Sequence, residues 1–108
     1  MLKPIAERDW KTWRKVSAVA YERFCGKVLQ SASAIASGSG DPHDRYEELY
    51  TLLKEAEVTI SNIFRDMRRS TALEQLVYGV GKGIISREEL AEFSEETQRT
   101  VRIILHEE

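Results

Sequence analysis

Apolar residues recur every three or four positions through most of this chain, which is the spacing of one face of an α-helix. In the first segment, from about residue 4 to about residue 37, the apolar and small residues fall on one narrow face at about 100° per residue. They are Ala6, Trp10, Trp13, Ser17, Ala20, Phe24, Val28, Ser31 and Ile35. Lys11, Lys15 and Glu22 fall on the opposite face. We predict one long amphipathic helix, which ends before the linker at residues 38–40.

A second long helix is predicted to begin at Asp41-Pro42, because Asp is a good helix cap and Pro fits the first helical position. Its apolar residues alternate at spacings of three and four, a heptad pattern: Tyr46, Leu49, Leu53, Ala56, Ile60, Ile63 and Met67. Tyr50 and Phe64 widen this face, and Glu57 falls within it. We expect Glu57 at the edge of the face, with its carboxylate in solvent; burial beside a polar partner is the alternative.

Two capping boxes predict the remaining helices. Thr71 with Glu74 opens a short helix that ends in the glycine-rich stretch at residues 79–83, and Ser86 with Glu89 opens a medium one. The last helix is expected to carry one apolar face made of Leu90, Phe93, Thr97, Val101, Ile104 and Leu105. The sequence therefore predicts an all-α fold, an antiparallel helical bundle of about four helices (two long, one short, one medium), as a single domain over residues 1–108.

Composition agrees with one folded domain and excludes some classes of protein. The chain has 108 residues, 42% of them apolar, and a formal net charge of −2, which argues against a disordered chain. Its single cysteine, Cys25, cannot form an internal disulfide. Neither an N-terminal signal segment nor an apolar run long enough for a membrane span is visible. We expect no membrane association and a cytoplasmic location.

Charge is unevenly distributed along the chain. Residues 1–30 carry seven basic and three acidic residues, a local charge of +4, whereas residues 41–57 and 86–108 each carry −4. If the first two helices are antiparallel, one end gathers the cations Arg8, Lys11, Arg14, Lys15, Arg65, Arg68 and Arg69. Beside Trp10 and Trp13, such an end is typical of an anion- or nucleic-acid-binding module. The favoured interpretation is that the cations pair with the acidic helices and with helix dipoles, and that the tryptophans lie in the core.

No catalytic or metal-binding motif is complete. The glycine-rich stretch at residues 79–83 lacks the spacing and the Ser or Thr of a phosphate-binding loop. Glu88-Glu89-x-x-Glu92 resembles the acidic opening of the all-α nucleoside-triphosphate pyrophosphatases, which hold magnesium, but no second acidic motif follows. Arg99 and His106 have a spacing similar to that of helical RNases of the HEPN type. We therefore expect no catalytic residue, no metal and no cofactor, and a small metal-dependent nucleotide hydrolase or helical RNase stays as an alternative.

The two long helices have more apolar face than a short and a medium helix can cover. A helix of about 30 residues is about 45 Å long, and an apolar face of that length needs partners along it. We therefore expect a non-catalytic protein that acts by protein–protein association, with a homodimer as the simplest solution and another protein as the alternative partner. Trp10, Trp13 and Tyr21 are the expected interface anchors.

Overall fold

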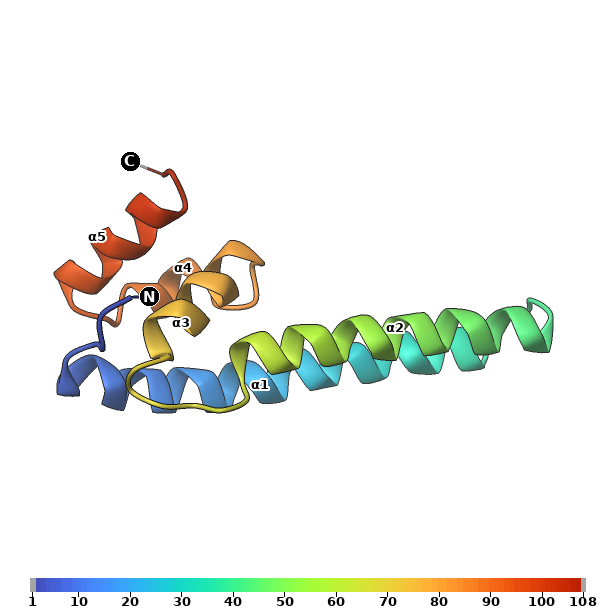
Figure 1. The fold of residues 1–108 in the computed structure, drawn as a ribbon. Helices are drawn as coiled ribbons and strands as arrows, with labels where there is room; N and C mark the ends of the chain where they lie inside the picture. The colour runs from blue at the N-terminus through green and yellow to red at the C-terminus, as the bar shows by residue number, and fades with distance from the viewer. Residues whose placement is uncertain (1, 108) are drawn as a thin grey trace.

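The computed structural model describes residues 2–107, which form five α-helices and no strand. The helices are α1 (Glu7–Ala36), α2 (Pro42–Ile63), α3 (Ala72–Gly81), α4 (Arg87–Leu90) and α5 (Glu95–Ile104) (Figure 1). The all-α class is confirmed. The number of helices is corrected from four to five, because the expected last helix is divided into α4 and α5. No helix in the described part of the chain has the length and apolar character needed to cross a membrane.

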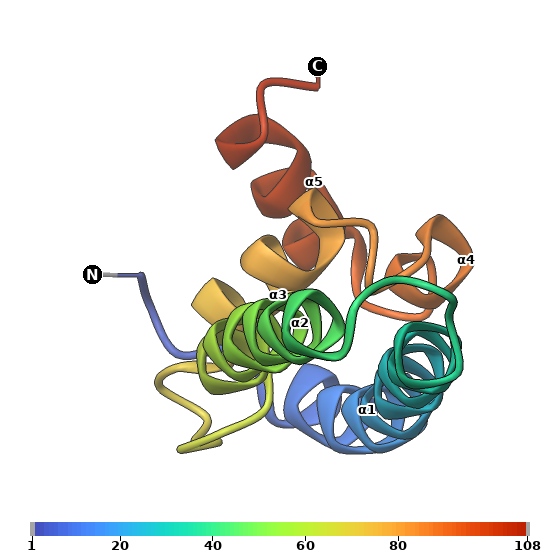
Figure 2. The same ribbon diagram turned by 90° about the vertical axis from the view of Figure 1, so that its right-hand side faces the viewer.

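The molecule has two regions that differ in shape. Helices α1 and α2 form a long antiparallel pair, and α3, α4 and α5 gather at one end of it (Figures 1 and 2). We call that end the head, and we call residues 24–60, which project from it as a helical hairpin, the arm. The molecule is elongated as a result, measuring 51 × 26 × 25 Å. The three shorter helices therefore cover only one end of the long pair, not its whole length.

The hydrophobic core lies in the head. It brings the first half of α1 together with the end of α2, with α3 and with the segments around α4 and α5, and its largest fully buried side chains include Trp13 and Phe93. Gly79 belongs to this packing, since a Cβ there would lie 2.6 Å from Ile85 Cγ1. Of the apolar residues in the arm, by contrast, only Ala56 is buried.

The division of the last helix has a local cause and a tertiary one. Ser94 is the N-cap of α5, and its hydroxyl accepts a hydrogen bond from the Thr97 N–H at 3.3 Å. The Asp9 carboxylate of α1 accepts a hydrogen bond from the Ser94 N–H at 2.8 Å, so this N–H is not available to continue a helix from α4. The chain therefore turns between α4 and α5, and Phe93 becomes part of the core at the turn.

Of the predicted caps, one is confirmed. Ser86 and Glu89 form a reciprocal capping box at the start of α4. Asp41 and Thr71 occupy the N-cap positions of α2 and α3, but their side chains make no capping hydrogen bond. The Thr71 hydroxyl instead accepts from the Arg68 N–H at 3.1 Å and so stabilises the loop before α3.

Candidate functional site

Large apolar side chains are exposed along one flank of the arm. Leu29 of α1 is 67% exposed, and Tyr46, Tyr50 and Leu53 of α2 are 67%, 51% and 48% exposed. The three α2 residues share one helical face because they are spaced by four and three residues. We call these four residues, with the groove that Leu29 and Leu53 line, the arm flank. Isolated exposed apolar residues are common on proteins, but a contiguous group on one face marks an interaction surface.

A shallow groove of about 280 Å³ runs between α1 and α2 on this flank. Leu29 and Leu53 contribute to it from the two helices, and Ala56, the small buried residue of the arm, is part of its wall. The full lining is Cys25, Val28, Leu29, Leu53, Ala56, Glu57 and Ile60. Since six of these seven side chains are apolar or thiol, the groove suits apolar side chains of another chain better than a polar ligand.

The tip of the arm is held together by Arg45. Its Nε donates to the Gly40 carbonyl at 3.0 Å, and its Nη1 donates to the carbonyl of Ala36, the last residue of α1. The carbonyls at the end of α1 have no partner within the helix, and a cation is favourable there. This link between α2 and the end of α1 keeps the two helices paired at the tip, far from the core.

Glu57 lies at the edge of the arm flank and is exposed, so the expected position at the edge is confirmed. Its carboxylate forms an ion pair with Arg65, with Oε2 and Nη2 3.1 Å apart. Both side chains are about half exposed, and such a pair contributes little to folding stability. The carboxylate is therefore available as a polar contact beside an apolar surface.

The aromatic residues expected as interface anchors all lie in the head. Trp13 has no exposed surface and belongs to the core, so it is not an interface anchor in this fold, and the favoured interpretation of a tryptophan in the core is confirmed for it. Trp10 and Tyr21 are half-buried against the same core, and the Tyr21 ring stacks on Phe64 with centroids 4.7 Å apart. The exposed aromatic residues of the long helices are Tyr46 and Tyr50 instead, both in the heptad pattern of α2 or beside it.

The three arginines after α2 are paired with carboxylates of their own chain. Arg65 pairs with Glu57, Arg68 Nη2 lies 3.0 Å from Asp66 Oδ2, and Arg69 Nη1 lies 3.6 Å from Glu7 Oε1. Arg69 Nε also donates to the Ile5 carbonyl at 2.6 Å, which fixes the N-terminal segment to the loop before α3. The other predicted cations, Arg8, Lys11, Arg14 and Lys15, are exposed on the first half of α1.

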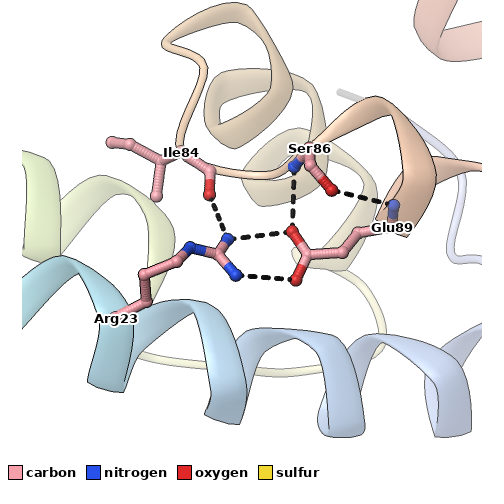
Figure 3. Close-up of polar contacts among 4 residues, drawn as sticks. All are labelled: Arg23, Ile84, Ser86 and Glu89. Atoms are coloured by element: carbon pink, nitrogen blue, oxygen red, sulfur yellow. Dashed lines mark hydrogen bonds and ion pairs between the residues drawn. The ribbon is translucent and has the colours of Figure 1, made fainter.

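A polar cluster joins the middle of α1 to the start of α4 (Figure 3). Arg23 donates to both carboxylate oxygens of Glu89, at 2.9 and 3.1 Å, and to the Ile84 carbonyl at 2.7 Å. Glu89 also accepts from the Ser86 N–H at 2.8 Å. Burial raises the pKa of Glu89, but these hydrogen bonds and the Arg23 charge outweigh it and leave the pKa below its ordinary value. Because both of its terminal nitrogens are bound to Glu89 or Ile84, Arg23 holds the head together and is not a free anion-binding group.

The buried carboxylate of Asp9 was missed by the sequence analysis. It accepts hydrogen bonds from the Ser94 N–H at 2.8 Å, the Ser94 hydroxyl at 2.6 Å and the Thr97 hydroxyl at 2.7 Å. Burial raises the pKa of Asp9, but these hydrogen bonds lower it by more than burial raises it, so the pKa lies below its ordinary value. Asp9 shares a face with Trp13 and Val16 at helical spacing, which was the available signal. All three bonds serve to anchor α5, so the group is structural.

The residues behind the enzyme alternatives are not assembled into a site. His106 lies two residues beyond the end of α5, with a left-handed φ of 58°, so it does not share a helix with Arg99. Glu89 is engaged by Arg23, and Glu92 lies after the four-residue α4. The helical-RNase pattern is therefore a matter of sequence spacing alone.

One group in the described part of the chain has the geometry for a cation. Asp41, His43 and Asp44 place a ligand atom each within 4.8 Å of one another at the exposed tip of the arm. Exposed acidic groups at a helix start are expected without any ion, because they suit the positive end of the helix dipole. This grouping on its own does not indicate a metal centre.

The arm flank is thus the surface that most needs an explanation, since the Asp9 and Glu89 carboxylates of the head are bound within the chain. Comparison with models of protein families, with curated proteins and with solved structures finds no match to this chain.

Proposed function

We propose that this protein is non-catalytic and acts by self-association, with the arm flank as the contact surface. The observation that carries the proposal is that burial differs along α1 and α2. In the head both helices contribute buried apolar residues to the core, whereas in the arm four large apolar residues of one flank are about half exposed or more. Covering them with a second copy removes apolar surface from water, which is the dominant favourable term in most protein association.

The size of the flank supports a dimer. Helix α2 has 22 residues, which at 1.5 Å per residue give a length of about 33 Å. Two adjacent helices of about 10 Å diameter present a face of roughly 33 × 20 Å, or about 650 Å² before side-chain relief is counted. Specific interfaces bury about 600–1,000 Å² per partner, so a face of this size lies at the lower end of the area that a stable dimer needs.

The anion-binding alternative has less support, because ion pairs with Glu57, Asp66 and Glu7 offset the charges of the three loop arginines.

The experiment that tests the proposed self-association is light scattering over a range of micromolar concentrations. We expect a mass near twice 12.4 kDa, the mass of one chain. A mass that stays at 12.4 kDa at every concentration would contradict it.

A matched pair of variants assigns the surface. Leu53→Glu places a charge in the centre of the arm flank and should give a monomer. Val58→Glu places the same charge on the same helix at a residue that is 55% exposed but lies on a different face, and should leave the dimer intact. If both variants dissociate, or neither does, the arm flank is not the interface.

A further inference from the structure

The α2 residues of the arm flank, together with Glu57 at its edge, have a symmetric spacing along the helix. Tyr46, Tyr50, Leu53 and Glu57 follow one another at spacings of four, three and four residues, so the spacing is the same in both directions along the helix. A second α2 that runs in the opposite direction therefore places Tyr50 opposite Leu53 and Tyr46 opposite Glu57. A twofold interface requires this reciprocity, because each contact must occur twice.

We propose that two copies of the chain pair with their arms antiparallel, about a twofold axis that passes between Tyr50 and Leu53. This inference rests on the self-association proposed above and adds the direction of the partner. The paired arms form a four-helix assembly, with one head at each of its ends.

The charge of Glu57 favours an antiparallel over a parallel pair of arms. A parallel pair would set the two Glu57 carboxylates opposite each other at an interface, where like charges disfavour association. An antiparallel pair sets each carboxylate opposite Tyr46 of the partner subunit, whose phenol O–H is a hydrogen-bond donor. Arg65 lies 3.1 Å from the Glu57 carboxylate within the same chain and offsets part of its charge.

Tyrosine at these positions also fits the proposed contacts. Tyr50 and Leu53 are about half exposed, and a second copy would pack the Tyr50 ring on the Leu53 side chain on both sides of the axis. Tyr and other aromatic residues are enriched at the centre of interfaces because they bury a large area with few rotatable bonds. The groove beside Leu29 and Leu53 would receive side chains at the same centre.

Distances between spin labels test the direction. In a Cys25→Ala background, a label at Ser39→Cys marks the tip of the arm and one at Ser61→Cys marks its base. If the arms are antiparallel, the two Ser39 labels are about 30 Å or more apart, because the helical rise on both sides of the axis separates them. The same arrangement brings Ser39 of one copy near Ser61 of the partner subunit. Parallel arms bring the two Ser39 labels within about 20 Å of each other, two helix diameters.

The dissociation constant of the dimer tests the proposed side-chain contacts between the two copies. Tyr46→Phe removes the proposed donor to Glu57 twice per dimer, and we expect the dissociation constant to rise about tenfold. Tyr50→Phe is the matched control, because Tyr50 faces a leucine, and should change the constant less than about twofold. Glu57→Gln should weaken an antiparallel dimer, whereas in a parallel dimer it would remove a repulsion and strengthen association.

The possible outcomes separate the two proposals. A monomer in light scattering overturns the self-association and with it this inference. A dimer with a short distance between the Ser39 labels, or one strengthened by Glu57→Gln, overturns the antiparallel arrangement alone. A dimer with separated tips and a selective loss on Tyr46→Phe supports both.

Discussion

The head and the arm are built from the same two long helices but are held together by different means. In the head, Trp13, Val16 and Ala20 of α1 are buried against elements distant in sequence, and Asp9 and Arg23 bind α5 and α4. In the arm, two helices face each other with one buried apolar residue, Ala56, and a tip held by Arg45. An isolated helical pair has little apolar surface to bury, since each helix covers only one side of the other.

This contrast shows that an amphipathic pattern indicates how much helix surface needs to pack against something. It does not indicate whether the same chain or another chain supplies the packing partner. In the head the partner is supplied by α3 and α5 of the same chain. In the arm the equivalent face of α2 continues into solvent through Tyr50 and Tyr46. The difference can be measured by making similar substitutions in the two regions.

The largest expected effect is a truncation in the core of the head. Trp13→Ala should lower the free energy of unfolding by about 3–5 kcal/mol, because the whole side chain is buried and its removal leaves a cavity. Leu53→Ala in the arm should cost less than about 1 kcal/mol below the concentration of dimerisation, since half of the side chain is already in water. Urea unfolding followed by circular dichroism measures both. Equal costs would mean that the arm is packed as tightly as the head.

The next effect concerns the attachment of α5 through Asp9. Asp9→Ala leaves the Ser94 N–H and the hydroxyls of Ser94 and Thr97 without their acceptor, and should cost about 2–3 kcal/mol. The loss should appear in the head alone, as faster amide hydrogen exchange in α5 with unchanged exchange at the tip of the arm. Equal acceleration in both regions would show that head and arm unfold as one unit.

Acid should weaken the head selectively. The pKa of Asp9 and that of Glu89 are lower in the folded chain than their ordinary values, so the unfolded chain takes up these protons first. The stabilisation is complete above the ordinary carboxyl pKa of about 4 and is lost as the pH falls through the lowered folded values. Asp9→Asn should therefore flatten the fall in unfolding free energy below about pH 4. An unchanged slope in this variant would exclude Asp9 as a source of the acid sensitivity.

A smaller effect on the free energy of unfolding is expected from the arginine–glutamate pair in the head, and none from a second such pair on the surface. Arg23→Gln should cost about 1–2 kcal/mol, because it breaks two hydrogen bonds to the largely buried Glu89 and one to Ile84. Arg87→Gln is the matched control: Arg87 pairs with Glu107 at the exposed end of the chain, and its loss should leave the unfolding curve unchanged. If Arg87→Gln cost as much as Arg23→Gln, the surface pair would be as important as the one in the head.

Local signals in the sequence were sufficient to predict the long helices, except for the end of the second one, which was expected to include Met67 but lies at Ile63. The first was expected over about residues 4–37 and the structure has Glu7–Ala36; the second was expected from Asp41-Pro42 and begins at Pro42. Glu57 at the edge of its face and the Ser86–Glu89 capping box were also predicted correctly. Each of these features depends on side chains within a few residues of each other.

The features that sequence reasoning missed depend on contacts across the chain. The break between α4 and α5 needs Asp9, which lies 85 residues before Ser94, so the periodicity through Leu90 and Val101 indicated one helix. The apolar face of α2 gave no sign that α3 would cover only its last turns. The expected anchors were Trp10, Trp13 and Tyr21, whereas the exposed aromatic residues are Tyr46 and Tyr50. That some apolar helix surface would stay uncovered was predictable, but its position was not.

The smallest expected effect is also one of opposite sign. Val58 is apolar and 55% exposed in α2, yet it lies away from the arm flank, so neither the core nor the proposed dimer uses it. Alanine has a higher helix propensity than the β-branched valine, and the little burial that Val58 loses is offset by this gain. Val58→Ala should therefore raise the free energy of unfolding by a few tenths of a kcal/mol, roughly the difference in helix propensity, and leave the mass of the assembly unchanged. Leu53→Ala, on the same helix and with similar exposure, should instead weaken association. A loss of stability or of the dimer in Val58→Ala would show that the arm buries a second face.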